Sequence, residues 1–430
     1  MKAARNSART TGKLPRAPIA DIVEEHLDEA AFYLERWDRA LTSPHHALAQ
    51  LRDGPEEAML AHVDGLAVGG ESAAKQLLWP VVEDDEADDW ARVGAAALAL
   101  LTMPGQDFSG RLLARLPAAP GAARTGIVRA LEIASLPALD PQLLAAVQSP
   151  TNGLLMGVLA ERRVDPGPLA LPYLQDGQPA TMRSSLMAIR FAKDRTAYVP
   201  IVERLMRASA PAVRLAAVET GLLWALPAAQ VACGQMAAAH EPNAMLLSAL
   251  LGRPGFEKPI YEALGDAEAR ASALWALGFA GTVAAADRAL QLMGDADPVT
   301  ARLAGEAFSS ITGLRLQGGF AVAVVDDAEA EAPPSTIDAL PLPNRDAVAA
   351  WWAQNRSRLA TQGRILDGEP WSGLLPLGRI APLSMLRRHV VLMEQALQLR
   401  GAGLFVSRRS LSRVQEVQAR ALLQTARKVQ

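Results

Sequence analysis

Residues 211–224 read PAVRLAAVETGLLW, and this stretch decides the fold. Its small and apolar residues recur three or four positions apart, so they form a stripe along one side of a helix. The stripe consists of Val213, Ala216, Ala217, Thr220, Gly221 and Trp224. Alanine has the highest helix propensity, and alanine and glycine leave room for close packing. The stretch therefore predicts a helix that is buried against a neighbouring helix.

The same pattern returns along the chain, with an arginine near the start of each copy. The arginines are Arg92, Arg124, Arg183, Arg214, Arg270 and Arg302, with Gly153 and Asn243 at the two positions that lack one. Most copies follow a proline, which suits the first helical turn because its missing N–H has no partner to lose there. These prolines are Pro120, Pro150, Pro179, Pro211, Pro242 and Pro298, the last preceded by Asp297 as a possible cap. The chain therefore contains about eight repeats of 27 to 32 residues.

Each repeat also provides a second helix, such as residues 198–207 or 283–293. One helical hairpin cannot bury its own apolar face, whereas stacked hairpins bury a continuous core and form a curved rod with a concave groove. We therefore predict an all-α fold: a right-handed α-solenoid of HEAT-like helical hairpins with a C-terminal helical cap. The recurring arginine is interpreted as a structural ladder that reaches acidic or carbonyl groups of the adjacent turn, with ligand binding as the alternative.

The two ends of the chain differ from the repeats. Glycines, prolines and acidic residues after the last repeat are typical of a linker, and arginine-rich helices follow it. The predicted segments are a disordered basic tail (1–17), an N-terminal helical cap (18–60) that opens with a helix over 18–40, the repeats (61–317), an acidic, proline-containing linker (318–343) and a basic helical domain (344–430) with helices over 345–359, 376–400 and 408–428.

Charge is distributed unevenly along the chain. Its formal net charge is −3, but residues 21–340 contain 24 basic and 41 acidic groups, a net charge of −17. Residues 341–430 contain 14 basic and 5 acidic groups, a net charge of +9. An acidic body repels a phosphate backbone, so nucleic acid is not the expected partner. The basic end would suit the acidic body of the same chain or a partner protein of complementary charge.

Neither end of the chain predicts contact with a membrane. The basic start lacks the apolar stretch of a secretory signal, and no segment approaches the ~18 apolar residues of a membrane span. We expect a cytoplasmic protein without a membrane partner. The single cysteine, Cys233, excludes an intramolecular disulfide and a multi-cysteine metal site, and it is interpreted as an inert buried thiol.

No catalytic constellation stands out in the sequence. A di-iron hydroxylase built on helical repeats needs His-Glu pairs on several helices, and this chain has one, His240-Glu241. A DNA glycosylase of similar architecture needs a basic inner face with aromatic residues. Trp224 and Trp275 have suitable positions, but the repeats around them are acidic, which favours a packing role. We predict that the chain is not an enzyme and has no catalytic residue, cofactor or metal ion, and we do not expect a small-molecule ligand.

Two features are candidates for contact with a partner protein. Trp351 and Trp352 are adjacent on a predicted helix, so their side chains project about 100° apart. One can be buried while the other faces a partner, or both can pack between the cap and the repeats. Arg302 and Glu306, in the last repeat, have the i,i+4 spacing of a helical ion pair. The alternative for this segment is the closing helix of the repeats.

Five short segments carry a resemblance to a known family. They are residues 304–314 (AGEAFSSITGL), 349–352 (AAWW), 25–32 (EHLDEAAF), 62–66 (HVDGL) and 364–368 (RILDG). With them the chain resembles a bacterial HEAT-like repeat family of unknown activity associated with type VI secretion gene clusters. The resemblance spans nearly the whole chain. It implies a cytoplasmic helper protein that binds an effector or a spike component, and it implies no catalytic residues.

Three functions follow as hypotheses. The first is a non-catalytic scaffold that acts as an adaptor or chaperone for a type VI secretion effector or spike component. The second is an immunity-type inhibitor that occludes a neighbouring toxin. The third is an enzyme built on HEAT-like repeats, either a lyase or a nucleic-acid glycosylase, which would need ionisable groups that converge inside the groove.

Overall fold

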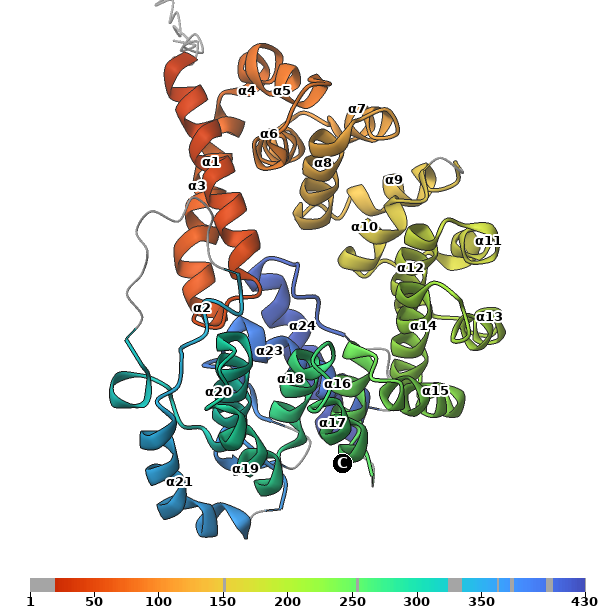
Figure 1. The fold of residues 1–430 in the computed structure, drawn as a ribbon. Helices are drawn as coiled ribbons and strands as arrows, with labels where there is room; N and C mark the ends of the chain where they lie inside the picture. Colours follow the sequence, from red (N-terminus) through yellow and green to blue (C-terminus); the bar gives the residue numbers. More distant parts are fainter. Residues whose placement is uncertain are drawn as a thin grey trace, which may run out of the picture. The chain divides into compact units, whose positions relative to one another are not determined.

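A computed structural model describes residues 20–149, 152–252, 255–323, 335–361, 363–371, 375–399 and 405–429. The predicted basic tail, Pro150 and residues 324–334 of the predicted linker lie outside the described residues. The regular structure of the described ranges is almost all helical, so the all-α prediction is confirmed at this level (Figure 1). Their two strands, β1 (Ile365–Leu366) and β2 (Glu369–Pro370), pair antiparallel as a short hairpin.

The chain divides into two compact units. The first unit contains Met1–Leu34 and Ala58–Ala130, and the second contains Glu35–Glu57 and Leu131–Gln430. The segment boundaries inferred from the sequence stay predictions. Among the described helices, none is both long and apolar enough to cross a lipid bilayer.

The helices of the first unit pack closely through glycine. Gly94 lies in α6 and Gly126 in α8, and a Cβ atom added to Gly126 would lie 2.6 Å from the Gly94 nitrogen. Backbone therefore meets backbone, which only residues without a side chain permit. The helical elements with residues in this unit are α1 (Ala20–Ala40), α3 (Glu57–Val68), α4 (Gly70–Ala73), the π-helical η2 (Ala74–Leu78), α5 (Trp79–Glu83), α6 (Trp90–Thr102), α7 (Ser109–Arg115) and α8 (Gly121–Ile133).

The second unit holds the remaining elements. The helices are α2 (Leu48–Leu51), the π-helical η1 (Arg52–Glu56), α9 (Leu139–Ala146), α10 (Leu155–Arg162), η4 (Gly167–Ala170), α11 (Leu171–Asp176), α12 (Pro179–Ala188), η5 (Ile189–Phe191), α13 (Val199–Leu205), α14 (Pro211–Leu223), α15 (Pro227–Ala238), α16 (Pro242–Leu251), α17 (Glu257–Ala263), α18 (Arg270–Ala280), α19 (Val283–Leu292), α20 (Pro298–Thr312), η6 (Gly318–Phe320), α21 (Arg345–Ala360), α22 (Leu377–Ile380), α23 (Met385–Gln398) and α24 (Ser412–Val429).

Two rows of helices make up most of the second unit. The first row consists of α10, α12, α14, α16, α18 and α20, and each of them contacts the next (Figure 1). The second row consists of α11, α13, α15, α17 and α19, and each of these contacts the following member of the first row. Helices therefore alternate between the two rows from α11 to α20.

The predicted helix starts agree with the structure. Pro179, Pro211, Pro242 and Pro298 each occupy the first position of a first-row helix, and the Asp297 carboxylate accepts hydrogen bonds from the amides of Val299 and Thr300. The small and apolar stripe quoted at the outset is buried along α14. These signals act within one turn of helix, so the sequence alone is enough to read them.

The C-terminal segment departs from its predicted helices in three places. The helix predicted over 376–400 is two helices, α22 and α23, because Pro382 lies between them and cannot continue a helical ladder. The helix predicted over 408–428 begins later, at Ser412. The β1–β2 hairpin was not predicted. Its turn contains Asp367 and Gly368, both with positive φ, and the Gly368 amide donates to the carbonyl of Ile311 in α20.

Candidate functional site

Five of the six repeat arginines hold carbonyl or carboxylate groups, so their structural interpretation is confirmed. In the first unit Arg92 pairs with Asp28, and Arg124 Nε donates to the Ala119 carbonyl at 3.0 Å. In the second unit Arg214 binds the Ala208 carbonyl at 2.8 Å and the Glu241 carboxylate at 2.9 Å, Arg270 Nε donates to the Leu264 carbonyl at 3.0 Å, and Arg302 binds the Leu340 carbonyl. Arg124, Arg214 and Arg270 thereby satisfy carbonyl groups at the ends of α7, α13 and α17, which have no donor within their own helix.

The predicted ion pair between Arg302 and Glu306 is wrong. Arg302 turns to the Leu340 carbonyl, and the buried Glu306 carboxylate accepts two bonds from Arg387 of α23, at 2.5 Å to Nε and 2.7 Å to Nη2. A bidentate arginine satisfies a buried carboxylate better than a neighbour one turn away on the same helix. Glu306 therefore anchors the C-terminal segment to α20.

The tryptophan pair lies between helices of the second unit. The rings of Trp351 and Trp352 both contact Phe308 of α20 edge-on, with centroids 6.2 and 5.2 Å away. Trp352 is 3 % exposed, and its Nε1 donates to the Asp287 carboxylate at 2.8 Å. These contacts match the alternative in which both rings pack between the C-terminal segment and the repeats. A role in binding a partner stays a prediction.

The C-terminal segment covers part of the first row. Helix α23 contacts α14 and α16, and Met385–Gln398 is buried on nearly all sides. Arg409, just before α24, pairs with Glu132 at 2.7 Å, and the Ser407 hydroxyl donates to Glu161 of α10. The face of α14 and α16 that contacts α23 is thus occupied over this length by the chain itself. The attraction of the basic end for the acidic body, one of the predicted options, is realised in these contacts.

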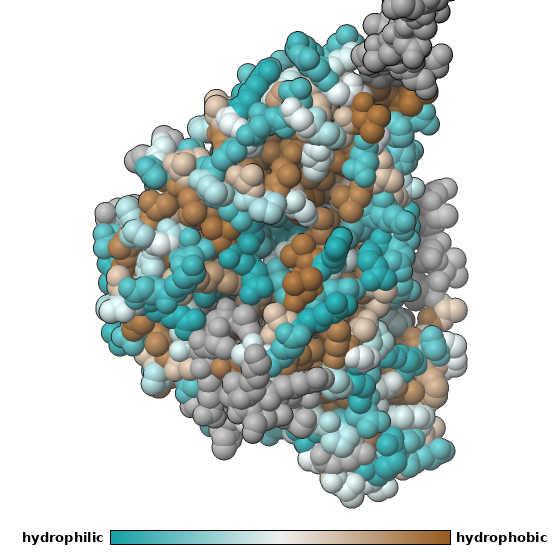
Figure 2. Space-filling view, turned by 180° about the vertical axis from the view of Figure 1, so that it is seen from behind, coloured by the Kyte–Doolittle hydropathy of each residue, from teal (hydrophilic) through white to brown (hydrophobic). Residues whose placement is uncertain are grey.

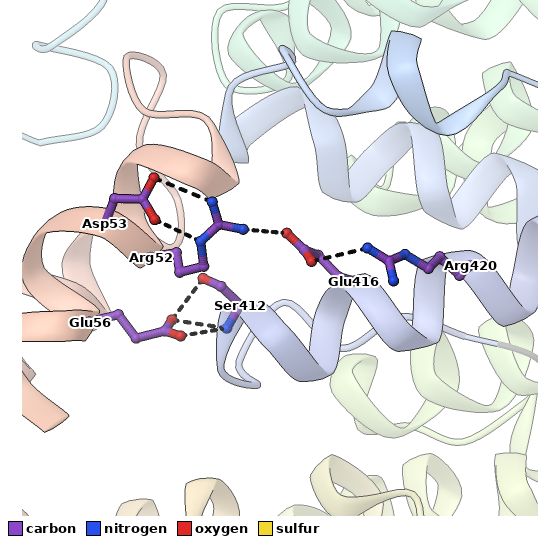
Figure 3. A network of polar contacts seen from close by, with 6 residues as sticks. All are labelled: Arg52, Asp53, Glu56, Ser412, Glu416 and Arg420. Carbon is purple, nitrogen blue, oxygen red and sulfur yellow. Dashed lines mark hydrogen bonds and ion pairs between the residues drawn. The ribbon is translucent and has the colours of Figure 1, made fainter.

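A polar network fixes the start of α24 (Figure 3). The Glu56 carboxylate, 3 % exposed, accepts hydrogen bonds from the Ser412 amide at 2.9 and 3.0 Å, from the Ser412 hydroxyl at 2.7 Å and from Trp37 Nε1 at 2.9 Å. One turn further along α24, Glu416 pairs with Arg52 at 2.9 Å. The helix is therefore held in place although part of its surface faces solvent.

That exposed surface of α24 forms one wall of a groove, which we call the basic groove. Its volume is about 1260 Å³, and its other walls are the end of α10 and the segment around η5. Val414 and Val417 of α24 are 36 % and 60 % exposed. Six basic side chains and one carboxylate line the groove: Arg162, Arg163, Arg190, Lys193, Arg195, Arg413 and Asp194.

Two of these arginines serve the fold. Arg162 pairs with Asp140 at 2.6 Å and also donates to three carbonyls, and Arg190 pairs with Glu219 at 2.6 Å. Their charges are compensated inside the protein.

Three other basic side chains of the groove have no carboxylate partner among the described residues: Arg163, Lys193 and Arg413. The Arg163 guanidinium lies over the Phe191 ring at 5.2 Å, its Nε has no hydrogen-bond partner in the described part of the chain, and burial lowers its pKa. The groove therefore offers positive charge that the protein itself leaves uncompensated.

Exposed apolar side chains alone would not single out this groove. Figure 2 shows hydrophobic patches in several places among hydrophilic residues. What distinguishes the basic groove is the combination of two exposed valines with an excess of positive charge. The groove was not predicted from the sequence, because its walls come from segments that lie far apart along the chain. A local signal was present, since residues 190–195 (RFAKDR) hold three basic residues in an acidic body.

Neither the cysteine nor the possible metal ligands form a reactive site among the described residues. The Cys233 side chain is fully buried, as predicted, and burial raises the pKa of its thiol to about 12. Within the described ranges, no three histidine, cysteine or carboxylate side chains are grouped as metal ligands would be. A comparison of the chain with protein-family models, with curated proteins and with solved structures finds no match.

Proposed function

We propose that this chain is a non-catalytic scaffold that binds an acidic segment of another protein in the basic groove. The observation that carries the proposal is the uncompensated positive charge of Arg163, Lys193 and Arg413 around two exposed valines. A partner segment with carboxylates and apolar residues complements this surface, with its carboxylates near the basic side chains and its apolar residues on Val414 and Val417.

We further propose that the repeats form a right-handed α-solenoid of HEAT-like hairpins. The order of contacts from α10 to α20 supports this architecture, as do the arginines that bridge successive elements. A solenoid holds its repeats in fixed register, so side chains from separate repeats form one extended surface. Arg163 and Lys193, which follow α10 and α12, are placed in this way.

The resemblance to the HEAT-like family suggests the partner. In this proposal the chain is a cytoplasmic adaptor or chaperone, and its partner is a type VI secretion effector or spike component. The groove would equally suit an immunity-type inhibitor that holds a toxin. Co-expression separates the two roles, because an inhibitor restores growth in cells that produce the toxin and a delivery adaptor does not.

Binding can be tested with one substitution and a matched control. Val417→Asp adds a negative charge to the α24 wall of the groove, and Val231→Asp makes the same change at a valine of α15 that is 62 % exposed, against 60 % for Val417. The chain and both variants are purified together with each effector and spike protein encoded beside it. We expect one of these proteins to bind the wild type and Val231→Asp, and Val417→Asp to weaken that binding at least tenfold.

Two results would contradict the proposal. One is that none of these proteins binds the wild-type chain at micromolar concentration. The other is that Val417→Asp binds as tightly as Val231→Asp, which would place the interface elsewhere.

A further inference from the structure

A second, separate cavity lies within the second unit, where α23 leaves part of the first row uncovered. Its volume is about 640 Å³, and its walls come from α10, α12, α14, α16, α18, α23 and residues 405–409. Part of its lining is apolar: Leu215, Leu246, Leu250, Trp275, Val390, Met393 and Phe405. The volume falls in the range of ~300–1,000 Å³ that small-molecule sites occupy in proteins.

Charged groups also line the cavity, and most of them are compensated. Arg190 pairs with Glu219 at 2.6 Å, and Arg409 pairs with Glu132 at 2.7 Å. Glu241 accepts a bond from Arg214 at 2.9 Å. These pairs leave little net charge of their own.

Glu161 also lines the cavity and accepts a hydrogen bond from the Ser407 hydroxyl, whereas Arg183 and Arg408 are the two basic side chains of this lining without such a partner. Neither side chain has a hydrogen bond or an ion pair with any described residue. They lie close enough to repel each other: burial, then Arg409, and also Arg183 lower the pKa of Arg408, against the opposite effect of Glu161 and Glu219. Two guanidinium groups that line the same cavity without partners form a site for an anion.

Arg183 differs from the other repeat arginines in having no hydrogen bond or ion pair with a described residue. Arg124, Arg214 and Arg270, at the same place in their repeats, bind carbonyl groups 3.0, 2.8 and 3.0 Å away. Arg183 does not take up this structural role, and its side chain lines the cavity instead. The arginine is therefore available to a ligand.

The histidine of the cavity does not supply a competing charge. His389 lies on α23 with its ring 5.9 Å from that of Phe405, and desolvation together with Arg408 and Arg388 lowers its pKa to about 3. The ring is neutral at physiological pH. It adds to the apolar side of the cavity, with one ring nitrogen left to donate and one to accept.

We propose that this cavity binds an amphiphilic carboxylate, a small aliphatic acid whose head is held by Arg183 and Arg408. The apolar body of the ligand lies against Leu215, Leu250 and Trp275. Arginine suits this task because its planar fork matches the two oxygens of a carboxylate. This site does not depend on the function proposed for the basic groove, because the two are lined by different unpaired arginines.

Calorimetric titration of the full chain with three ten-carbon probes tests the proposal. Decanoate has the anionic head, decanol lacks the charge and decyltrimethylammonium reverses it. We expect decanoate to bind with one-to-one stoichiometry at least tenfold more tightly than either of the other two, since bonds to a charged head are the stronger ones.

Variants locate the site. Arg183→Gln combined with Arg408→Gln is expected to weaken decanoate at least tenfold, and Arg207→Gln, at an exposed arginine outside the cavity, to leave it unchanged. Leu246→Trp fills the cavity and should abolish binding, with near-ultraviolet circular dichroism as the check on folding. The proposal is overturned if decanoate does not bind, if decanol or the cation binds equally well, or if the double variant binds as the wild type does.

Discussion

Arg163 ends α10 in a conformation that an arginine rarely adopts. Its φ is 60°, in the left-handed region, at the C-terminal cap where glycine is the usual residue. A side chain there costs about 1 kcal/mol relative to glycine. The same residue leaves Nε without a partner in the described part of the chain and points its charge into the basic groove. Arg163 thus lowers the stability of the fold and leaves a positive charge unpaired among the described residues, which makes it a candidate functional residue.

Arg163→Gly is therefore expected to stabilise the fold and weaken partner binding together. Ala225→Gly is the matched control, because Ala225 also has a φ of 60° and lies outside the groove. Both variants should gain about 1 kcal/mol in chemical denaturation. Only Arg163→Gly should lose affinity for the partner, and equal affinity of the two variants would show that the Arg163 charge is not used.

His389 makes the free energy of unfolding depend on pH. Its pKa is about 3 in the folded chain against 6.5 for an unperturbed histidine. Below pH 6.5 the unfolded chain takes up a proton at this site that the folded chain does not, so the free energy of unfolding falls as the pH is lowered. His389→Gln removes this difference.

We expect the wild type to lose about 2 kcal/mol more stability than His389→Gln between pH 7 and pH 5. Urea denaturation at both pH values measures the difference. Other titrating groups act equally in the two proteins, so parallel losses would mean that His389 is protonated in the fold.

At the scale of helices, the repeat arginines join the end of one helix to the start of another. Arg214 holds the carbonyl of Ala208, just after α13, and the carboxylate of Glu241, the residue at the N-cap position of α16. Such a contact fixes three elements with one side chain. Arg183 has the same place in its repeat and makes no such contact among the described residues.

Arg214→Ala should consequently cost about 1–3 kcal/mol, because it leaves a carbonyl and a carboxylate without their donor. Arg183→Ala should cost less than about 0.5 kcal/mol, the usual range for a side chain without such contacts. Thermal and chemical denaturation of the two variants measure both values. Equal losses would show that Arg183 supports the fold in the same way as Arg214.

At the scale of the whole molecule, residues far apart in sequence are joined within the second unit. Glu56 binds Ser412 across 356 positions, and Arg387 binds Glu306 across 81. These contacts place the C-terminal segment in the core of the unit. Burial of α23 shows the same, since an independent cap would keep one face in solvent.

Glu56→Ala is expected to destabilise the chain by about 2–4 kcal/mol, since it removes the buried acceptor of the hydrogen bonds from Ser412 and from Trp37 Nε1. Glu57→Ala, at the exposed neighbouring carboxylate, is the control and should stay within about 0.5 kcal/mol. Hydrogen exchange should show α24 losing protection first in Glu56→Ala. Unchanged protection of α24 would mean that other contacts hold this helix.

The sequence by itself determined the helices and most of their first turns. Proline at the first position, Asp297 as a cap and the stripe of Val213 to Trp224 act over a few residues, so they need no knowledge of what lies across the fold. The arginine ladder was also predictable, because Arg214 reaches a carbonyl only six residues before it.

Only the tertiary structure decided what those helices enclose. Glu306 was expected to pair with Arg302 one turn away, but a buried carboxylate takes the partner that satisfies both its oxygens, and that partner, Arg387, arrives from a distant helix. The basic groove and the cavity have the same origin, since their walls come from segments that meet only when α23 and α24 pack on the repeats. Local sequence sets where each helix begins and which of its faces is apolar. The free energy of burying the whole chain sets which side chains meet.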